Sequence, residues 1–420
     1  MAPLHRSRVL EDRTEGGVSA QEFNVVVYGA TGFTGRLVAE HLLRVYGAEG
    51  EVRWAMAGRD MDKLRAVSAE IGAPMNLPLI AADASDVNAL EALAHRTRVI
   101  ITTVGPYQRY GEPLLAACVR AGTDYVDLCG EPNWMAAMIA KYEQQAKQSS
   151  ARIVFSCGFD SIPFDCGVFF LQQEAKQRFG QPARRVRGRV RRMKGGFSGG
   201  TLASLLATQD AVKRDPKLVR AMMDPFALSP ERMVAQPAGD KVVHDEGLGW
   251  SAPFIMAAIN TKNVHRTNAL LNYAYGRDFT YDEMQLFEGE TGRGQARAAA
   301  NQAKLQNGLL NFPPTRALLR RFALPKPGEG PSKEQRESGI YDVLFIGEAA
   351  DGASLRAAVR GDKDPGYGST SKMISEAALC LADTSRETTP GGIWTPAAAM
   401  GAPLIERLQA RAGLTFTLEN

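Results

Sequence analysis

The chain has 420 residues, of which 45% are hydrophobic and 23% charged, and its formal net charge at pH 7 is +4. This composition is ordinary for a globular protein of about two domains, and the small net charge argues against a dedicated nucleic-acid binder. The five cysteines form no Cys-x-x-Cys pair and the five histidines form no His-x-x-x-His pair, so the sequence predicts neither a disulfide framework nor a metal site. A reducing, cytoplasmic setting fits best, and no apolar run of about 18 residues predicts a membrane-spanning helix.

Short apolar runs alternate with helix-like stretches from residue 23 to about residue 160, after a polar segment (1–22) that we expect to be a disordered tail. The runs that read as strands are 24–28, 53–57, 76–81, 99–104, 125–128 and 152–156. Apolar strands that alternate with helices are typical of a parallel sheet covered on both faces. The order predicts an α/β fold with a doubly wound, Rossmann-type domain over 23–160.

The pattern changes after this domain. Longer, half-exposed strands are indicated at 186–193, 341–346 and 354–360, with helices at 202–212 and 296–310 between them. This predicts an α+β second domain over 161–368, with a turn-rich surface loop at 325–339. We expect this domain to serve substrate binding or oligomerisation. Two helices are expected at the end of the chain, at 369–381 and 395–412. We expect this C-terminal segment, 369–420, to pack back on the first domain.

A glycine-rich turn follows the first strand directly and leads into a helix. Its residues are Gly29, Ala30, Thr31, Gly32, Phe33, Thr34 and Gly35. Glycines at this spacing let the chain turn tightly and bring backbone N–H groups to a pyrophosphate at the helix N-terminus. Because the turn stands in a strand–turn–helix context, all seven residues are assigned to a dinucleotide site.

The end of the second strand indicates which dinucleotide is bound. An NAD site normally places a carboxylate there to bind the ribose hydroxyls, but this strand ends in Gly58, Arg59 and Asp60. A guanidinium at position 59 can bind a 2′-phosphate and stack beside adenine, which favours NADP(H). Asp60 keeps an NAD interpretation open, and Arg59 can also be read as a solvated turn residue.

Further residues stand at the predicted carboxyl edge of the sheet, where doubly wound folds bind ligands. Asp83 follows the third strand and is assigned to the adenine end, although it reads equally well as a helix cap. Thr103 lies at the end of the fourth strand and Gly105 directly after it, and both are assigned to the cofactor. Tyr107 is a candidate for the reaction cleft.

Several long segments resemble the saccharopine dehydrogenase-like family. They are VYGATGFTGR, the AGR turn at 57–59, TTVGPYQRYGEPLLAAC, AGTDYVDLCGE, CGFDSIPFDCG, GGTLAS, DPGYGSTSKM and WTPAAAMG. Within that family the chain is most similar to the trans-acting enoyl reductases, which act on lipid or polyketide-type acyl chains. The resemblance implies a nicotinamide cofactor held by Gly29, Gly32, Gly35 and Arg59, but it implies no particular catalytic residue.

The catalytic residue stays unassigned among five candidates, which are Tyr107, Asp127, Asp160, Tyr367 and Lys372. No tyrosine is followed by lysine four residues later, so the short-chain dehydrogenase mechanism is excluded. Asp127 and Glu131 can equally bind loop amides, and Lys372 can equally be a solvated helix residue. Cys157 reads as a buried small residue.

The basic run at 184–194 places Arg185, Arg187, Arg189 and Arg191 on one strand face. Two interpretations remain open: a solvated or subunit-contacting face, and a docking surface for a phosphopantetheine arm or an acidic carrier protein. The glycine-rich turn at 195–201 that follows can bind an anion or can allow close backbone packing.

The expected function is an NADPH-dependent reductase, with a 2-enoyl group on a small-molecule or carrier-bound acyl chain as substrate. Peripheral membrane contact and a homodimer are compatible with this expectation, and no metal is expected. Two alternatives stay open: a saccharopine-type C–N dehydrogenase, and a non-catalytic, lipid-associated protein that only binds the dinucleotide.

Overall fold

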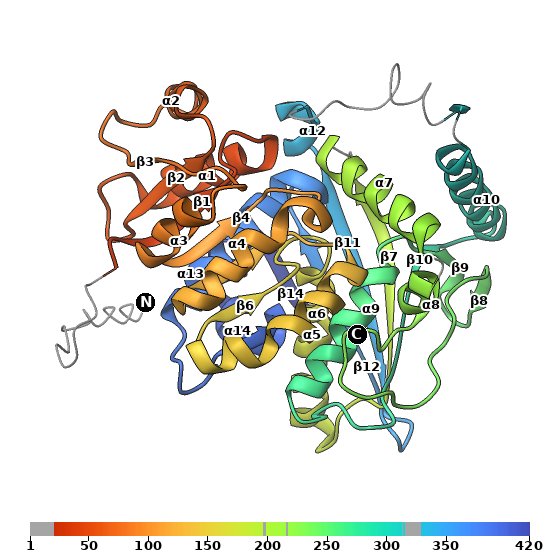
Figure 1. The fold of residues 1–420 in the computed structure, drawn as a ribbon. Helices are drawn as coiled ribbons and strands as arrows, with labels where there is room; N and C mark the ends of the chain where they lie inside the picture. The colour runs from red at the N-terminus through yellow and green to blue at the C-terminus, as the bar shows by residue number, and fades with distance from the viewer. Residues whose placement is uncertain (1–20, 196–198, 216, 313, 316–328) are drawn as a thin grey trace, which may run out of the picture.

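The computed structural model describes residues 21–420 except 196–198, 216, 313 and 316–328 (Figure 1). All but the last two residues of the tail expected at 1–22 therefore lie outside the described residues, as does part of the turn at 195–201 and of the loop at 325–339. Within the described ranges, no helix is both long and apolar enough to cross a membrane.

The first sheet is parallel throughout and has the strand order β13-β6-β5-β4-β1-β2-β3. Its strands are β1 (Phe23–Tyr28), β2 (Trp54–Gly58), β3 (Leu79–Ala81), β4 (Thr97–Thr102), β5 (Asp124–Asp127), β6 (Arg152–Val154) and β13 (Gly392–Trp394). The six predicted strands and the Rossmann-type order are confirmed. The strands β1, β2 and β4 to β6 are almost wholly buried, as apolar runs covered on both faces should be.

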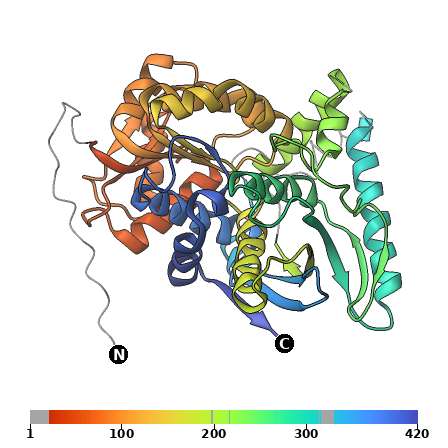
Figure 2. The same ribbon diagram turned by 90° about the horizontal axis from the view of Figure 1, so that it is seen from below.

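Helices cover both faces of this sheet. They are α1 (Phe33–Tyr46), α2 (Met61–Glu70), α3 (Val87–His95), α4 (Tyr107–Ala121) and α5 (Pro132–Ser149), together with α13 (Thr370–Asp383) from the end of the chain. The helix α13 packs beside α1 and against β1, β4 and β5, while α3, α4 and α5 pack side by side in a separate apolar cluster. The expectation that the C-terminal helices return to the first domain is confirmed (Figure 2).

The second sheet is mixed, with the order β14-β12-β11-β7-β10-β9-β8. Its strands are β7 (Arg185–Lys194), β8 (Val243–Asp245), β9 (Gly249–Pro253), β10 (Thr280–Phe287), β11 (Ile340–Glu348), β12 (Ser354–Gly361) and β14 (Leu414–Glu419). The predicted strands correspond to β7, β11 and β12. The helix α6 (Ile162–Phe179) packs against β11 and β12, where a Cβ at Gly167 would lie 2.5 Å from the Phe345 ring.

Other helices surround the second sheet. They are α7 (Gly199–Arg214), α8 (Lys217–Met223), α9 (Ala257–Leu270), α10 (Gly292–Asn311) and α12 (Lys333–Glu337). The short helix α12 lies inside the stretch expected to be a loop at 325–339, because Ser332 and Gln335 form a capping box at its start.

The C-terminal segment differs from the prediction of helices alone. After a π-helical turn η1 (Pro365–Ser369), it contains α13, α14 (Pro396–Arg407), a second π-helical turn η2 (Leu408–Ala412) and the two strands β13 and β14. The strand β13 extends the first sheet beside β6, and β14 pairs with β12 in the second. Residues 369–420 are therefore shared by both sheets.

The helix α9 joins the two halves through buried polar side chains. Asn263 donates to the Ser161 hydroxyl at the start of α6, and Thr267 donates to Asp165 at 2.6 Å. Arg266 donates to the backbone carbonyl of Ile393 at 2.5 Å. Because α9 also packs against β10, where Asn260 donates to Glu283 at 2.7 Å, it links the second sheet to α6 and to β13 of the first.

Candidate dinucleotide site and reaction cleft

The glycine-rich turn adopts the close backbone packing that its sequence predicts. Gly29 has a φ of +89° and donates its N–H to the Ala57 carbonyl at 2.9 Å. A Cβ at Gly35 would lie 2.2 Å from the Gly29 carbonyl oxygen, so the first turn of α1 sits directly on the loop. The helix begins after Gly32 without a side-chain cap, which leaves its N-terminal N–H groups for an anion.

The end of β2 presents a cation beside this loop. A Cβ at Gly58 would lie 3.7 Å from the Thr31 side chain, so position 58 faces the glycine-rich turn. An NAD site would carry a carboxylate at this position, and here the residue is glycine. Arg59 is exposed and, among the described residues, forms no hydrogen bond or ion pair. Asp60 caps α2 by accepting from the backbone N–H groups of Lys63 and Asp62, both at 3.1 Å, and these bonds lower its pKa.

Asp83 forms a local turn at the end of β3. Its carboxylate accepts from the Ser85 hydroxyl at 2.6 Å and from the Ser85 N–H at 2.8 Å, which lowers its pKa. The residue that caps α3 is Asp86, which accepts from the Ala89 N–H at 3.1 Å. Arg59 also contributes to the lowered pKa of Asp83, so these two charges lie near each other, after the ends of β2 and β3.

Thr103 and Gly105 lie at the end of β4. The Thr103 hydroxyl donates to the Gly29 carbonyl at 3.3 Å, which places Thr103 against the glycine-rich turn. A Cβ at Gly105 would lie 3.5 Å from Ser204 Oγ of α7. The helix α7 also contacts α4, where Gln108 donates to Thr208 at 3.0 Å. The carboxyl edge of the first sheet is thus bordered by α7 of the second half.

Tyr107 and Asp127 are buried and engaged in local hydrogen bonds. The Tyr107 hydroxyl donates to the Thr102 carbonyl at 3.2 Å and accepts from the Leu128 N–H at 3.0 Å. Asp127 accepts from Tyr125 and from the N–H groups of Cys129 and Ser156. Burial raises the pKa of Asp127 to about 7. Both side chains hold neighbouring loops in place.

Glu131 and Cys157 also have internal partners. The Glu131 carboxylate accepts from the N–H groups of Tyr107 and Gln108, at 3.0 and 2.9 Å. It therefore caps the N-terminus of α4, where a negative charge is favourable. The Cys157 thiol is buried against backbone carbonyls, and burial raises its pKa, so it is not a nucleophile at neutral pH.

Asp160 differs from these carboxylates. It is half-buried, and its side chain forms no hydrogen bond or ion pair with another described residue. It lies over the loop that follows β5, where a Cβ at Gly130 would lie 3.0 Å from Asp160 Oδ2. Burial raises its pKa to about 6. A carboxyl group with these properties at the ligand-binding edge can hold a proton near neutral pH and transfer it.

The two candidates near the C-terminus are placed differently from each other. The Tyr367 ring lies edge-on to the Phe33 ring of the glycine-rich turn, with 5.2 Å between their centres, and is buried. Lys372 forms an ion pair with Asp362 at 3.1 Å on the first turn of α13. Burial lowers the pKa of Lys372. The structure therefore places Tyr367 beside the glycine-rich turn and pairs Lys372 with a carboxylate.

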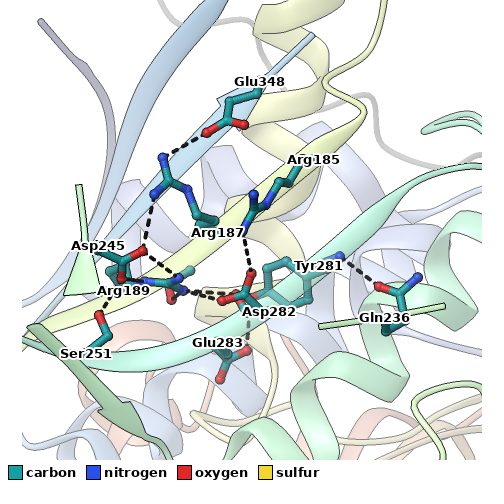
Figure 3. A network of polar contacts seen from close by, with 11 residues as sticks. Arg185, Arg187, Arg189, Gln236, Asp245, Ser251, Tyr281, Asp282, Glu283 and Glu348 are labelled. Atoms are coloured by element: carbon teal, nitrogen blue, oxygen red, sulfur yellow. Dashed lines mark hydrogen bonds and ion pairs between the residues drawn. The ribbon is translucent and has the colours of Figure 1, made fainter. Parts of the chain in front are cut away.

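Arg185, Arg187 and Arg189 of the basic run share one face of β7, as predicted, but their partners are internal (Figure 3). Arg189 is buried and contacts Asp245 at 2.6 Å and Asp282 at 2.7 Å. Arg187 contacts Asp245 and Glu348, and Arg191 contacts Asp342 and Glu419. Burial alone would raise the pKa of Asp245, but the bonds from Arg189 and Ser251 lower it to about 2. These arginines are neutralised within the sheet.

Asn263 was not predicted as part of this region, whereas Ser161 stands in the segment CGFDSIPFDCG that carries the family resemblance. The side-chain hydrogen bond between the two places α9 beside Asp160, although they are 102 positions apart and Asn263 stands in no recognisable motif. Within the described residues, no group of three His, Cys, Asp or Glu side chains is arranged to hold a metal ion.

Comparison with known proteins agrees with this geometry. The family model for the saccharopine dehydrogenase NADP binding domain matches residues 25–154, which include the glycine-rich turn. A solved structure of apo saccharopine dehydrogenase (L-Glu forming) from Saccharomyces cerevisiae has the same overall fold. Its TM-score is 0.52 at 12% identity, over 95% of this chain and 100% of that chain.

Relatives from mycobacteria match over nearly their whole length. A Mycobacterium tuberculosis protein named "Putative trans-acting enoyl reductase" is 42% identical, over 94% of this chain and 97% of its own. The trans-acting enoyl reductases of Mycobacterium ulcerans and Mycobacterium leprae are 38% and 37% identical, over 93% and 92% of this chain and 96% of each relative. The chain therefore belongs to the saccharopine dehydrogenase-like family of NAD(P)-binding oxidoreductases, in the group that contains the trans-acting enoyl reductases.

Proposed function

We propose that this protein is an NADPH-dependent reductase that saturates the 2-enoyl group of a lipid or polyketide-type acyl chain, free or attached to a carrier. The observation that carries the proposal is the full-length similarity to the trans-acting enoyl reductases. The five cysteines are free and buried, which is compatible with a reducing, cytoplasmic setting.

The residues around the glycine-rich turn fit an NADP(H) molecule. The close packing of Gly29 and Gly35 and the uncapped start of α1 suit the pyrophosphate. The exposed Arg59, which has no partner among the described residues, would bind the 2′-phosphate, while Asp60 is engaged in capping α2 and Asp83 in its turn with Ser85. When bound, the reduced cofactor supplies the hydride.

Asp160 is the proposed proton donor. Hydride addition at the β-carbon of an enoyl thioester leaves an electron pair at the α-carbon, and that carbon then needs a proton. The half-buried Asp160, free of hydrogen bonds to other described residues, supports this role, as does the burial that raises its pKa to about 6. After transfer, the carboxylate can regain a proton from solvent.

Arg59 tests the preference for NADP(H). In Arg59→Ala we expect the affinity for NADPH to fall about 10- to 100-fold, because a charged hydrogen bond to the 2′-phosphate is lost, while the affinity for NADH stays unchanged. Calorimetric titrations with both cofactors measure this. Arg65→Ala is the matched control, since Arg65 is exposed and paired with Asp62 on α2. Equal affinities of the wild-type protein for NADPH and NADH would contradict the proposed preference.

A further inference from the structure

Residues from the second half of the chain enclose Phe33, the first residue of α1. The Tyr367 ring packs edge-on against it, and a Cβ at Gly330 would lie 2.5 Å from its ring. The Arg336 guanidinium lies over the same ring, with its central carbon 5.8 Å from the ring centre. Because Phe33 directly follows Gly32, these three residues border the place where a dinucleotide's pyrophosphate meets the helix.

The backbone that carries Arg336 is firmly held. The helix α12 has a capping box at Ser332, and the carbonyl of Arg336 accepts from the Asp364 N–H at 2.9 Å. The Asp364 side chain in turn accepts from the N–H groups of Tyr367 and Gly368, at 3.1 and 2.7 Å. The end of α12 and the turn η1 therefore form one unit beside the glycine-rich turn.

Among the described residues, the guanidinium of Arg336 forms no hydrogen bond or ion pair, and its Nε is buried without an acceptor. Burial raises the pKa of the nearby Asp364 carboxyl, and the positive charge of Arg336 acts on that carboxyl with a smaller, lowering effect. Arg36 lies at a similar distance from the Phe33 ring, 5.7 Å, but is paired with Glu70 at 2.7 Å. A buried donor without an acceptor is costly, so an anion at this position would relieve that cost.

We propose that Arg336 binds the pyrophosphate of the dinucleotide from the side opposite the glycine-rich turn. This inference rests on the proposed NADP(H) site and adds to it a cation from outside the Rossmann-type domain. The pyrophosphate is common to NADPH and NADH. Arg336 therefore contributes affinity for both cofactors, whereas Arg59 contributes the preference for one of them.

The test is a set of calorimetric titrations with NADPH and with NADH on the wild-type protein, Arg336→Gln, Arg336→Lys and the control Arg36→Gln. In Arg336→Gln we expect both affinities to fall by the same factor, about 10- to 100-fold, with the preference for NADPH unchanged. Arg336→Lys should recover part of the loss, because it restores the charge without the planar fork. Arg36→Gln should change either affinity by less than about threefold.

Thermal unfolding of the cofactor-free variants separates binding from packing. If Arg336 only stacks on Phe33, Arg336→Gln lowers the melting temperature and leaves both affinities within about threefold of the wild type, which would overturn the inference. Loss of NADPH affinity alone would also overturn it, since it would place Arg336 at the 2′-phosphate. Failure of the wild-type protein to bind either cofactor would instead refute the proposed function.

Discussion

Gly35→Ala is expected to reduce NADPH affinity by more than about 100-fold. The added methyl group would lie 2.2 Å from the Gly29 carbonyl oxygen and 2.8 Å from Thr103 Oγ1. Both contacts are far inside van der Waals distance, so the first turn of α1 must move away from the loop. That movement withdraws the N–H groups that would bind the pyrophosphate, and such positional errors are costly at a preorganised site. The measurement is calorimetric titration with NADPH.

Gly294→Ala is the control for this prediction. Gly294 lies in α10, and an added Cβ there would meet no atom within 4 Å, so the affinity should not change. Circular dichroism of the cofactor-free proteins verifies that Gly35→Ala has kept its secondary structure. A folded Gly35→Ala protein that binds NADPH within about threefold of the wild type would show that the cofactor lies elsewhere.

Asp160→Asn is expected to lower kcat for acyl-chain reduction by about 100- to 10,000-fold while leaving the dissociation constant of NADPH unchanged. Asparagine keeps the size of the side chain but cannot supply a proton. Asp62→Asn serves as the control, because Asp62 is an exposed carboxylate paired with Arg65 on α2. The steady-state rate of NADPH oxidation with a 2-enoyl thioester measures the effect. Retention of more than a third of the wild-type kcat would remove Asp160 from the mechanism.

The pH profile gives a second readout for Asp160. Burial raises its pKa to about 6, so the carboxyl group is protonated below that pH and loses its proton above it. A proton donor must be in its acidic form, and kcat/KM for reduction should therefore be constant below about pH 6 and fall as the pH rises through that value. The fall should be absent from the residual activity of Asp160→Asn. Its persistence there would assign the titrating group to another residue.

The Rossmann-type domain could be predicted from the sequence because its signals are local. The glycine-rich turn, the apolar run before it and the helix after it are contiguous, and each predicted strand is an apolar run of four to six residues between helix-like stretches. The strand β13 has three residues and was not predicted, since its place beside β6 depends on how residues 369–420 pack. The strands β3 and β6 also have three residues, but they stand in the alternation of apolar runs and helices over 23–160, and β13 does not.

The sorting of the candidate residues required the structure. The hydroxyl of Tyr107 is occupied by the Leu128 N–H, which is 21 positions away, and Lys372 is paired with Asp362 across the start of α13. The arginines of β7 were predicted to share a face, but the acids that neutralise Arg189 come from β8 and β10, which were not predicted. Charge balance of this kind depends on strand order and cannot be inferred from a local run.

The most direct test of the central claim follows the hydride itself. The protein is incubated with NADPH deuterated at C4, in each stereochemical form, and with a long-chain 2-enoyl thioester, and the product is analysed by mass spectrometry. We predict that one of the two deuterated forms of NADPH gives a saturated thioester with one deuterium at the β-carbon for each NADPH oxidised. The other form should give the same thioester without deuterium. The account would be contradicted if the enoyl thioester caused no oxidation of NADPH while glutamate and an aldehyde did. That result would indicate C–N bond chemistry instead.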